Sequence, residues 1–293
     1  MTSAKKYGLL LFKVALIGLA IYLVLTRSDL DKIKNYLSHI PLMILVISFA
    51  LIVLAQIVSA LRSQYYFNSI GLRLNTRFVI GLYFTGCLYN SFLPGGISGD
   101  GYKIYLLGKL SHVRRVTIFR ILVSERASGL LWLLLFLYAF IYLSGSYTHI
   151  PYGFPLLCSA VPVTLIGYLL STRWLLKENW RTSLKASIYS FIIHGIAMLV
   201  SLLILYTFHE TTVPFSTLAA FLMLFCLSNV LTVLPISIGG IGIRELAFLY
   251  GSPFLLLSPE PGIALSLVYF SLSTLMALNG FFFWHKLTRL YTT

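Results

Sequence analysis

Long apolar runs constrain this chain more than any other feature of its sequence. A helix needs about 20 apolar residues to cross a hydrocarbon core of roughly 30 Å, whereas a soluble domain carries about 25% charged residues. Here only 10% of the 293 residues are charged. We therefore predict an all-α polytopic membrane protein with about six transmembrane spans. The runs lie at about 8–25, 42–60, 117–143, 154–171, 186–208 and 262–284.

The net charge of +14 does not indicate a nucleic-acid partner. Lys and Arg lie between the apolar runs, as they do in the cytoplasmic loops of membrane proteins. Cys87, Cys158 and Cys226 fall inside apolar segments without metal-ligand spacing, so we expect no disulfide, no metal and no cofactor. His194 lies alone in an apolar run and is read as a packed polar residue. No nucleophile triad or P-loop is present, so no enzymatic activity is expected.

Two further apolar segments, 78–110 and 215–257, are each interrupted by proline and glycine. The interruptions lie at 94–101 and 235–245. Proline ends a helix, and glycine permits positive φ and close approach of backbones. An interrupted helix is costly in lipid unless protein or water satisfies its polar groups. We therefore predict two re-entrant helical hairpins; a pair of kinked ordinary spans is the alternative.

An offset of 141 residues relates the two interruptions without a gap. The same offset places the second predicted span on the fifth and the third on the sixth, which indicates duplication. We expect a single membrane domain, 1–293, built from repeat halves of about 1–146 and 147–293. The offset aligns Pro94 with Pro235, Ile97 with Ile238, Gly99 with Gly240, Gly101 with Gly242 and Lys103 with Arg244.

Charge asymmetry orients the predicted spans. When 62–77, 103–126, 173–185 and both termini are placed in the cytoplasm, most Lys and Arg lie on that side. The first hairpin then enters from the cytoplasm and the second from outside. Each half crosses an odd number of times, so the halves are inverted. Inverted repeats with broken helices are typical of transporters, and we expect a multi-pass protein of the cytoplasmic (inner) membrane.

Charged residues follow both interruptions. The returning limb of each hairpin would point its free N–H groups and positive dipole end at the membrane interior, where they favour an anion such as a lipid phosphate. Lys103 and Arg244 lie about one turn beyond. Charged residues this deep are functional candidates, although both could instead snorkel to an interface. Asp100 and Glu245 are candidates to pair with these cations or to contact a cationic headgroup.

The segments 90–103 and 234–245 resemble two signatures of the lysylphosphatidylglycerol synthase membrane-region, or flippase-like, family. Ser124, Glu125 and Arg126 resemble a third signature, and the resemblance covers nearly the whole chain. A structural ion pair between Glu125 and Arg126 is the alternative there. In the best-known members this region translocates an aminoacylated phospholipid made by a separate soluble domain. This sequence contains no such domain, so the resemblance implies a translocator without synthase activity.

Other members of that family are tied to lipid-linked sugar or polyprenyl-phosphate pathways, so the resemblance does not identify the lipid. It implies substrate-binding roles for Asp100, Lys103, Arg126, Arg244 and Glu245. The candidate substrate-binding set also includes Asn90, Ser98, Gly99, Gly101, Gly240 and Gly242.

These patterns together predict a lipid translocator that moves an anionic or zwitterionic headgroup through a site between the two hairpins. The expected partners are membrane lipids with a phosphate headgroup, and a lipid-modifying enzyme is a further candidate. One alternative is an integral-membrane transferase acting on a polyprenyl-phosphate-linked or glycerophospholipid substrate, for which Asp100 is the best catalytic carboxylate. The other is an accessory protein that positions a lipid-processing enzyme.

Overall fold

The computed structural model describes residues 18–19, 21–93, 97–149, 151–177, 180–208, 213–233, 240, 242–284 and 287. These residues form α-helices, one short 3-10 helix and connecting turns, and no strand occurs among them, which confirms the all-α prediction. The elements are α2 (Leu30–Ser38), α3 (Leu42–Ser69), α4 (Thr76–Phe92), α5 (Ser98–Leu110), α6 (Arg115–Leu143), η1 (Ser146–His149), α7 (Gly153–Leu176), α8 (Trp180–Thr207), α9 (Phe215–Thr232), α10 (Ile243–Phe254), α11 (Glu260–Leu278) and α12 (Gly280–Trp284).

Within the described residues, six helical segments are long and apolar enough to cross a membrane. Helices α3, α6, α7 and α8 match the second to fifth predicted spans, and α11 with α12 matches the sixth. The remaining segment is α9, with 18 residues, which the sequence analysis assigned to a hairpin limb. The predicted first span, 8–25, lies mostly outside the described residues. The chain is therefore a multi-pass membrane protein.

Several helices extend further than the apolar runs indicated. We expected Arg62 in a cytoplasmic loop, and this was wrong: α3 continues to Ser69 and buries Arg62. The returning limbs also begin earlier than predicted, α5 at Ser98 and α10 at Ile243. Helices extend past the apolar runs because intrahelical hydrogen bonds continue wherever packing satisfies the polar side chains. Asp100 and Lys103 therefore lie in the first two turns of α5, and Arg244 and Glu245 lie in the first turn of α10.

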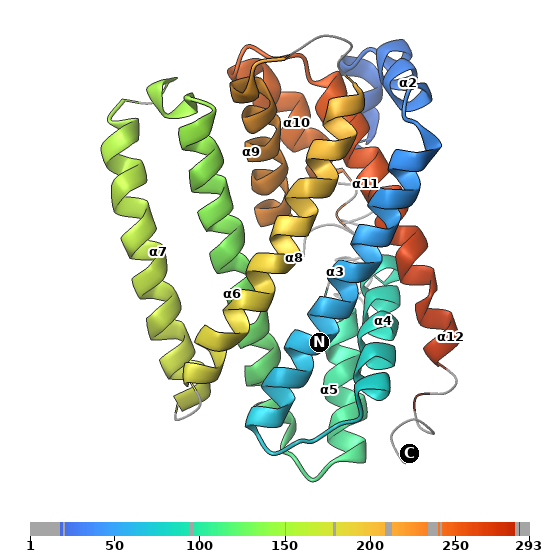
Figure 1. Ribbon diagram of the computed structural model, residues 1–293, viewed down its shortest axis with the longest axis vertical. Helices are drawn as coiled ribbons and strands as arrows, with labels where there is room; N and C mark the ends of the chain where they lie inside the picture. Colours follow the sequence, from blue (N-terminus) through green and yellow to red (C-terminus); the bar gives the residue numbers. More distant parts are fainter. Residues whose placement is uncertain are drawn as a thin grey trace.

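Two helical hairpins occupy opposite ends of the molecule (Figure 1). Helices α4 and α5 lie side by side in the lower part of the view, and α9 and α10 lie in the upper part. At the first hairpin, a Cβ built on Gly99 would lie 2.1 Å from the Gly86 carbonyl oxygen. Only glycine permits this backbone contact. The prolines of both interruptions, Pro94 and Pro235, lie outside the described residues.

Helix packing repeats across the two halves. The 141-residue offset relates α3 to α8, α4 to α9, α5 to α10, and α6 to α11 with α12. Helix α6 packs against α9, and its counterparts α11 and α12 pack against α4. In the same way α5 contacts α6 and α10 contacts α11, while α3 and α8 pack on each other. Each hairpin is thus held by long helices of the other half, and residues from both tips line one cavity.

Candidate functional site

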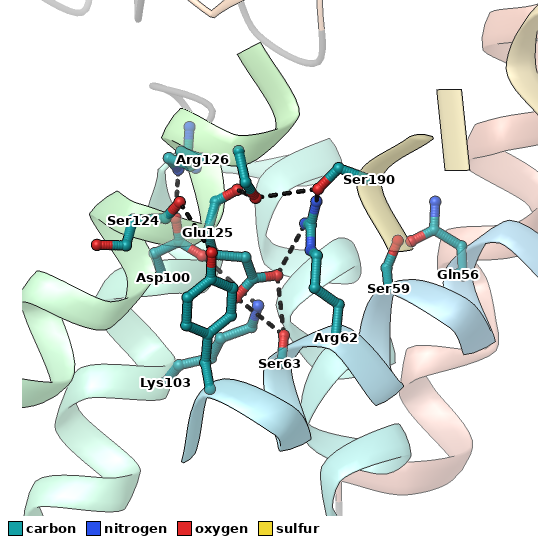
Figure 2. Close-up of polar contacts among 12 residues, drawn as sticks. Gln56, Ser59, Arg62, Ser63, Asp100, Lys103, Ser124, Glu125, Arg126 and Ser190 are labelled. Carbon is teal, nitrogen blue, oxygen red and sulfur yellow. Dashed lines mark hydrogen bonds and ion pairs between the residues drawn. The ribbon is translucent and has the colours of Figure 1, made fainter. Parts of the chain in front are cut away.

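A buried ion pair joins α3 to α6. Arg62 Nη2 donates to Glu125 Oε1 at 2.9 Å, and Arg62 Nη1 donates to Ser190 Oγ of α8 at 2.8 Å. The two charged side chains point toward each other (Figure 2). They are only 9% and 5% exposed. Ser63 Oγ lies 2.9 Å from both carboxylate oxygens of Glu125. A buried pair is tolerated when further hydrogen bonds satisfy it, so this group ties α3, α6 and α8 together.

A second charged group lies beside this pair, at the start of α5. Arg126 Nε donates to Asp100 Oδ2 at 2.6 Å, and Lys103 Nζ lies 3.6 Å from Asp100 Oδ1. Figure 2 shows Asp100, Lys103 and Arg126 gathered next to Glu125. Asp100 also occupies the first turn of α5, where the helix dipole favours a carboxylate. Two cations therefore share one carboxylate, and this group carries excess positive charge.

Lys103 is buried at 5% exposure rather than extended to an interface. Its Nζ lies 4.0 Å from the centroid of the Tyr83 ring, a cation–π distance. A Cβ on Gly86 would lie 3.0 Å from Lys103 Cε, so the absence of a side chain there leaves room for the lysine. The ammonium group is held between an aromatic face and Asp100.

The corresponding position at the other tip, Arg244, has a different environment. Its Nε is buried and has no hydrogen-bond partner among the described residues. The guanidinium carbon lies 5.6 Å from the centroid of the Tyr269 ring. Glu245 does not neutralise it by a hydrogen bond: its carboxylate accepts from the Gly242 N–H at 2.7 Å and from Ser266 Oγ at 2.7 Å. The guanidinium therefore retains a buried donor.

Three neighbouring cavities lie between the two tips in the described part of the chain. A cavity of about 120 Å³ is lined by Asp100, Lys103 and Arg126. One of about 250 Å³ is lined by both Arg126 and Arg244, and one of about 290 Å³ by Arg244 together with Asn90. Because each cavity shares lining residues with the other two, we treat them as one polar cavity. Arginines from both halves thus face a common space.

The structure brings most of the predicted site residues together. Asn90, Asp100, Lys103, Arg126, Gly240 and Arg244 all line the polar cavity. The others do not line it. Gly99 contacts α4, Gly101 is exposed, and Gly242 and Glu245 cap α10. Ser98 is the first residue of α5.

The sequence analysis missed or misread several residues of the site. Glu125 and Arg126 do not pair with each other, because they point to Arg62 and Asp100 respectively. Gln56 lines two parts of the polar cavity, and His194 lines one of them. A usable signal was present, since polar residues inside a span are costly and mark functional positions. No group of His, Cys, Asp and Glu able to hold a metal ion occurs among the residues that the structure describes.

The family model for the lysylphosphatidylglycerol synthase TM region matches residues 10–181, which is more than half of the chain. The match covers α2 to α7, and therefore the whole first hairpin and the signature around Arg126. No curated protein matches the chain.

Proposed function

Because this chain belongs to the lysylphosphatidylglycerol synthase membrane-region family, we propose that it is a lipid translocator. It moves a phospholipid or another lipid-linked anionic headgroup between the leaflets of the membrane. The family ties the chain to lipid biology, and the helices make it a multi-pass membrane protein. The leaflet-to-leaflet movement is the step that we add.

The observation that carries the proposal is Arg244. A buried donor without a partner is costly, and more so when the group is charged. Arg244 lines two parts of the polar cavity, and Arg126 of the other half lines one of them. A phosphate in the cavity would give the Arg244 guanidinium a charge-assisted hydrogen bond. An anionic headgroup is therefore the ligand that this site fits best.

The path follows from the arrangement of the hairpins. In our proposal α4–α5 and α9–α10 are re-entrant from opposite membrane faces, and the polar cavity between their tips is the crossing point for the headgroup. The hydrocarbon tails remain in the bilayer. We propose that both termini lie in the cytoplasm of an inner-membrane protein, and the distribution of Lys and Arg between the apolar runs supports this orientation. Movement is passive or coupled to an ion gradient.

The transferase alternative is less well supported by the site. It requires Asp100 as a catalytic carboxylate, but Arg126 and Lys103 already neutralise that group. Both oxygens of this carboxylate are thus already engaged within the protein. The accessory alternative predicts lipid binding without lipid movement, which a transport assay separates from our proposal.

Leaflet exchange in proteoliposomes tests the function. Fluorescent phosphatidylglycerol that crosses to the other leaflet is detected by its protection from a membrane-impermeant quencher. Arg244→Gln removes one charge-assisted hydrogen bond to the phosphate, and we expect exchange to slow by about tenfold or more. Arg120→Gln is the matched control, because Arg120 is an exposed arginine outside the cavity. Equal rates for wild type and Arg244→Gln would contradict the proposed site, and binding without exchange would favour the accessory alternative.

Cysteine accessibility tests the topology. His112 lies between α5 and α6, and Thr148 lies in η1, between α6 and α7, so the two residues flank opposite ends of α6. Both residues are exposed. In a Cys158→Ser background, we expect His112→Cys to react from the cytoplasmic side and Thr148→Cys from the outer side. Reaction of both from one side would rule out the inverted arrangement.

A further inference from the structure

A large apolar cavity of about 680 Å³ lies between α6 and the α9–α10 hairpin. Its volume falls within the range of about 300–1,000 Å³ that is typical of ligand pockets. Charged residues are absent from the lining described by the structure. Helix α6 contributes Leu137 and Ile141, α9 contributes Leu224, Leu227 and Leu231, and α10 contributes Ile243 and Ala247. Such a surface binds hydrocarbon and has no group suited to an ion.

The apolar cavity is adjacent to the polar cavity along three helices. On α10, Ile243 lines the apolar cavity and the next residue, Arg244, lines the polar one. At the end of α9, Leu231 lines the apolar cavity, and Val233, two residues further along the sequence, lines the polar cavity. On α6, Leu137 follows Leu133 of the polar cavity by about one helical turn. The hairpin tip therefore separates a cationic site from an apolar one.

The length of the apolar cavity corresponds to one leaflet. It extends along α10 from Ile243 at the tip to Phe254 and Leu255 at the far end. Helix α10 has 12 residues, so it is about 18 Å long. One leaflet contributes about half of a hydrocarbon core of roughly 30 Å. A single hydrocarbon chain can thus lie along α10 over the depth of a leaflet.

We propose that this apolar cavity holds one hydrocarbon chain of the lipid whose phosphate binds Arg244. The inference rests on the proposed function. The hydrocarbon chain runs from the tip along α10, so its free end lies near Phe254. A lipid resident in the leaflet around α9 and α10 would lie the other way, with its headgroup at the surface and its chain end near Ile243. In the proposed orientation the headgroup lies at the tip and the end of the hydrocarbon chain lies near Phe254. This orientation is expected of a lipid whose headgroup has entered from the opposite leaflet.

Photo-cross-linking determines which way the chain lies. The probe is phosphatidylglycerol with a diazirine on the terminal carbon of one acyl chain, in phosphatidylcholine vesicles that contain the wild-type protein. We expect labelling of Tyr250 to Leu255 that excess unlabelled phosphatidylglycerol removes. Labelling concentrated at Leu231 and Ile243 would indicate a resident lipid and overturn the proposal. Labelling confined to the exposed surface of α7 would also overturn it.

Filling the cavity tests whether the chain position matters for transport. Ala247 lines the apolar cavity, whereas Ala139 is exposed on α6 and lines none of the cavities described above. Ala247→Trp excludes several methylene groups, and we expect exchange to fall by about tenfold or more. Ala139→Trp adds the same side chain to the lipid-facing surface and should exchange at the wild-type rate. Ala247→Leu, with a smaller expected loss, serves if the tryptophan variant does not fold.

The two proposals fail in different ways. Suppose that Arg244→Gln slows exchange while both Ala247 variants retain the wild-type rate. The proposed position of the hydrocarbon chain is then wrong, but the proposal that the protein is a lipid translocator stands. If the wild-type protein exchanges no lipid, the translocator is wrong. Competed labelling near Phe254 would then still support the position of the bound chain.

Discussion

The two hairpin tips use aligned cations in different ways. At the α4–α5 tip, Lys103 lies 3.6 Å from Asp100 and over the Tyr83 ring. At the α9–α10 tip, Arg244 has a ring beside it, but its buried Nε has no hydrogen-bond partner among the described residues. At the first tip Lys103 is paired with a carboxylate of the protein, whereas at the second tip Arg244 keeps a buried donor without a partner among the described residues. The second tip is therefore better suited to an anionic ligand.

The difference comes from what surrounds each tip. The second half has no charged residue at the positions that correspond to the first tip's ionic partners. Without those partners, Arg244 has the Tyr269 ring beside it but no carboxylate paired with it among the described residues, and an anion that enters the cavity could supply that charge. The offset of 141 residues aligns Arg62 with Leu203, Asp100 with Ile241, Glu125 with Ser266 and Arg126 with Leu267.

The largest expected effect concerns the structural ion pair of the first half. Glu125→Gln leaves Arg62 buried beside a neutral group, and removing one partner of a buried pair costs about 3–5 kcal/mol. We expect a clearly lower thermal unfolding midpoint in detergent. Replacing both partners, as Arg62→Met with Glu125→Leu, should recover most of the loss because no charge remains unpaired. A midpoint unchanged by Glu125→Gln would show that the pair is not structural.

A smaller effect is expected at the glycines of the first tip. An alanine Cβ at Gly99 would meet the Gly86 backbone, and overpacking of this kind costs about 1–3 kcal/mol. Gly101→Ala is the control, because no atom lies within 4 Å of its Cβ position and alanine favours a helix. We expect Gly99→Ala to lower the thermal midpoint and Gly101→Ala to leave it equal or higher. Equal effects would mean that α4 and α5 do not touch at Gly99.

Removing the charge at the second tip should change the thermal midpoint in the opposite direction to the substitutions in the first half. Arg244→Gln removes a buried charge whose Nε lacks a hydrogen bond. Without lipid, we therefore expect the free energy of unfolding to stay equal or to rise by about 1 kcal/mol, and the thermal midpoint to be equal or higher. Added phosphatidylglycerol should stabilise the wild type and not this variant. A large fall in midpoint without lipid would show that Arg244 has a structural role like that of Arg62.

A last substitution makes the first tip resemble the second. Asp100→Asn removes the carboxylate shared by Lys103 and Arg126. The contact with Arg126, which is 37% exposed, contributes at most about 1 kcal/mol, whereas Lys103 is only 6% exposed and loses its ion-pair partner, so we expect a lower thermal midpoint. Lys103 then becomes available to an anion in the polar cavity. Binding of fluorescent phosphatidylglycerol, measured by competition, should tighten. Weaker binding would indicate that Asp100 itself contacts the headgroup.

Much of the fold could be predicted because spans depend on composition and length. Lipid offers no hydrogen bonds, so long apolar runs must be helices, and five of the six predicted spans coincide with helices of the structure. The first, at 8–25, falls mostly outside the described residues. Helix ends were less predictable. Arg62 lies within α3 because Glu125 and Ser190, distant in sequence, satisfy its charge.

The site shows the same division between local pattern and distant contact. The sequence by itself determined that this is a helical membrane protein with aligned cations beside two interruptions, since these are properties of composition and spacing. Only the tertiary structure decided that Lys103 is neutralised and that Arg244 keeps a free donor. Pairing depends on which side chains other helices bring within hydrogen-bonding distance. Those neighbours decide whether a buried charge is paired within the protein or is left to bind a ligand.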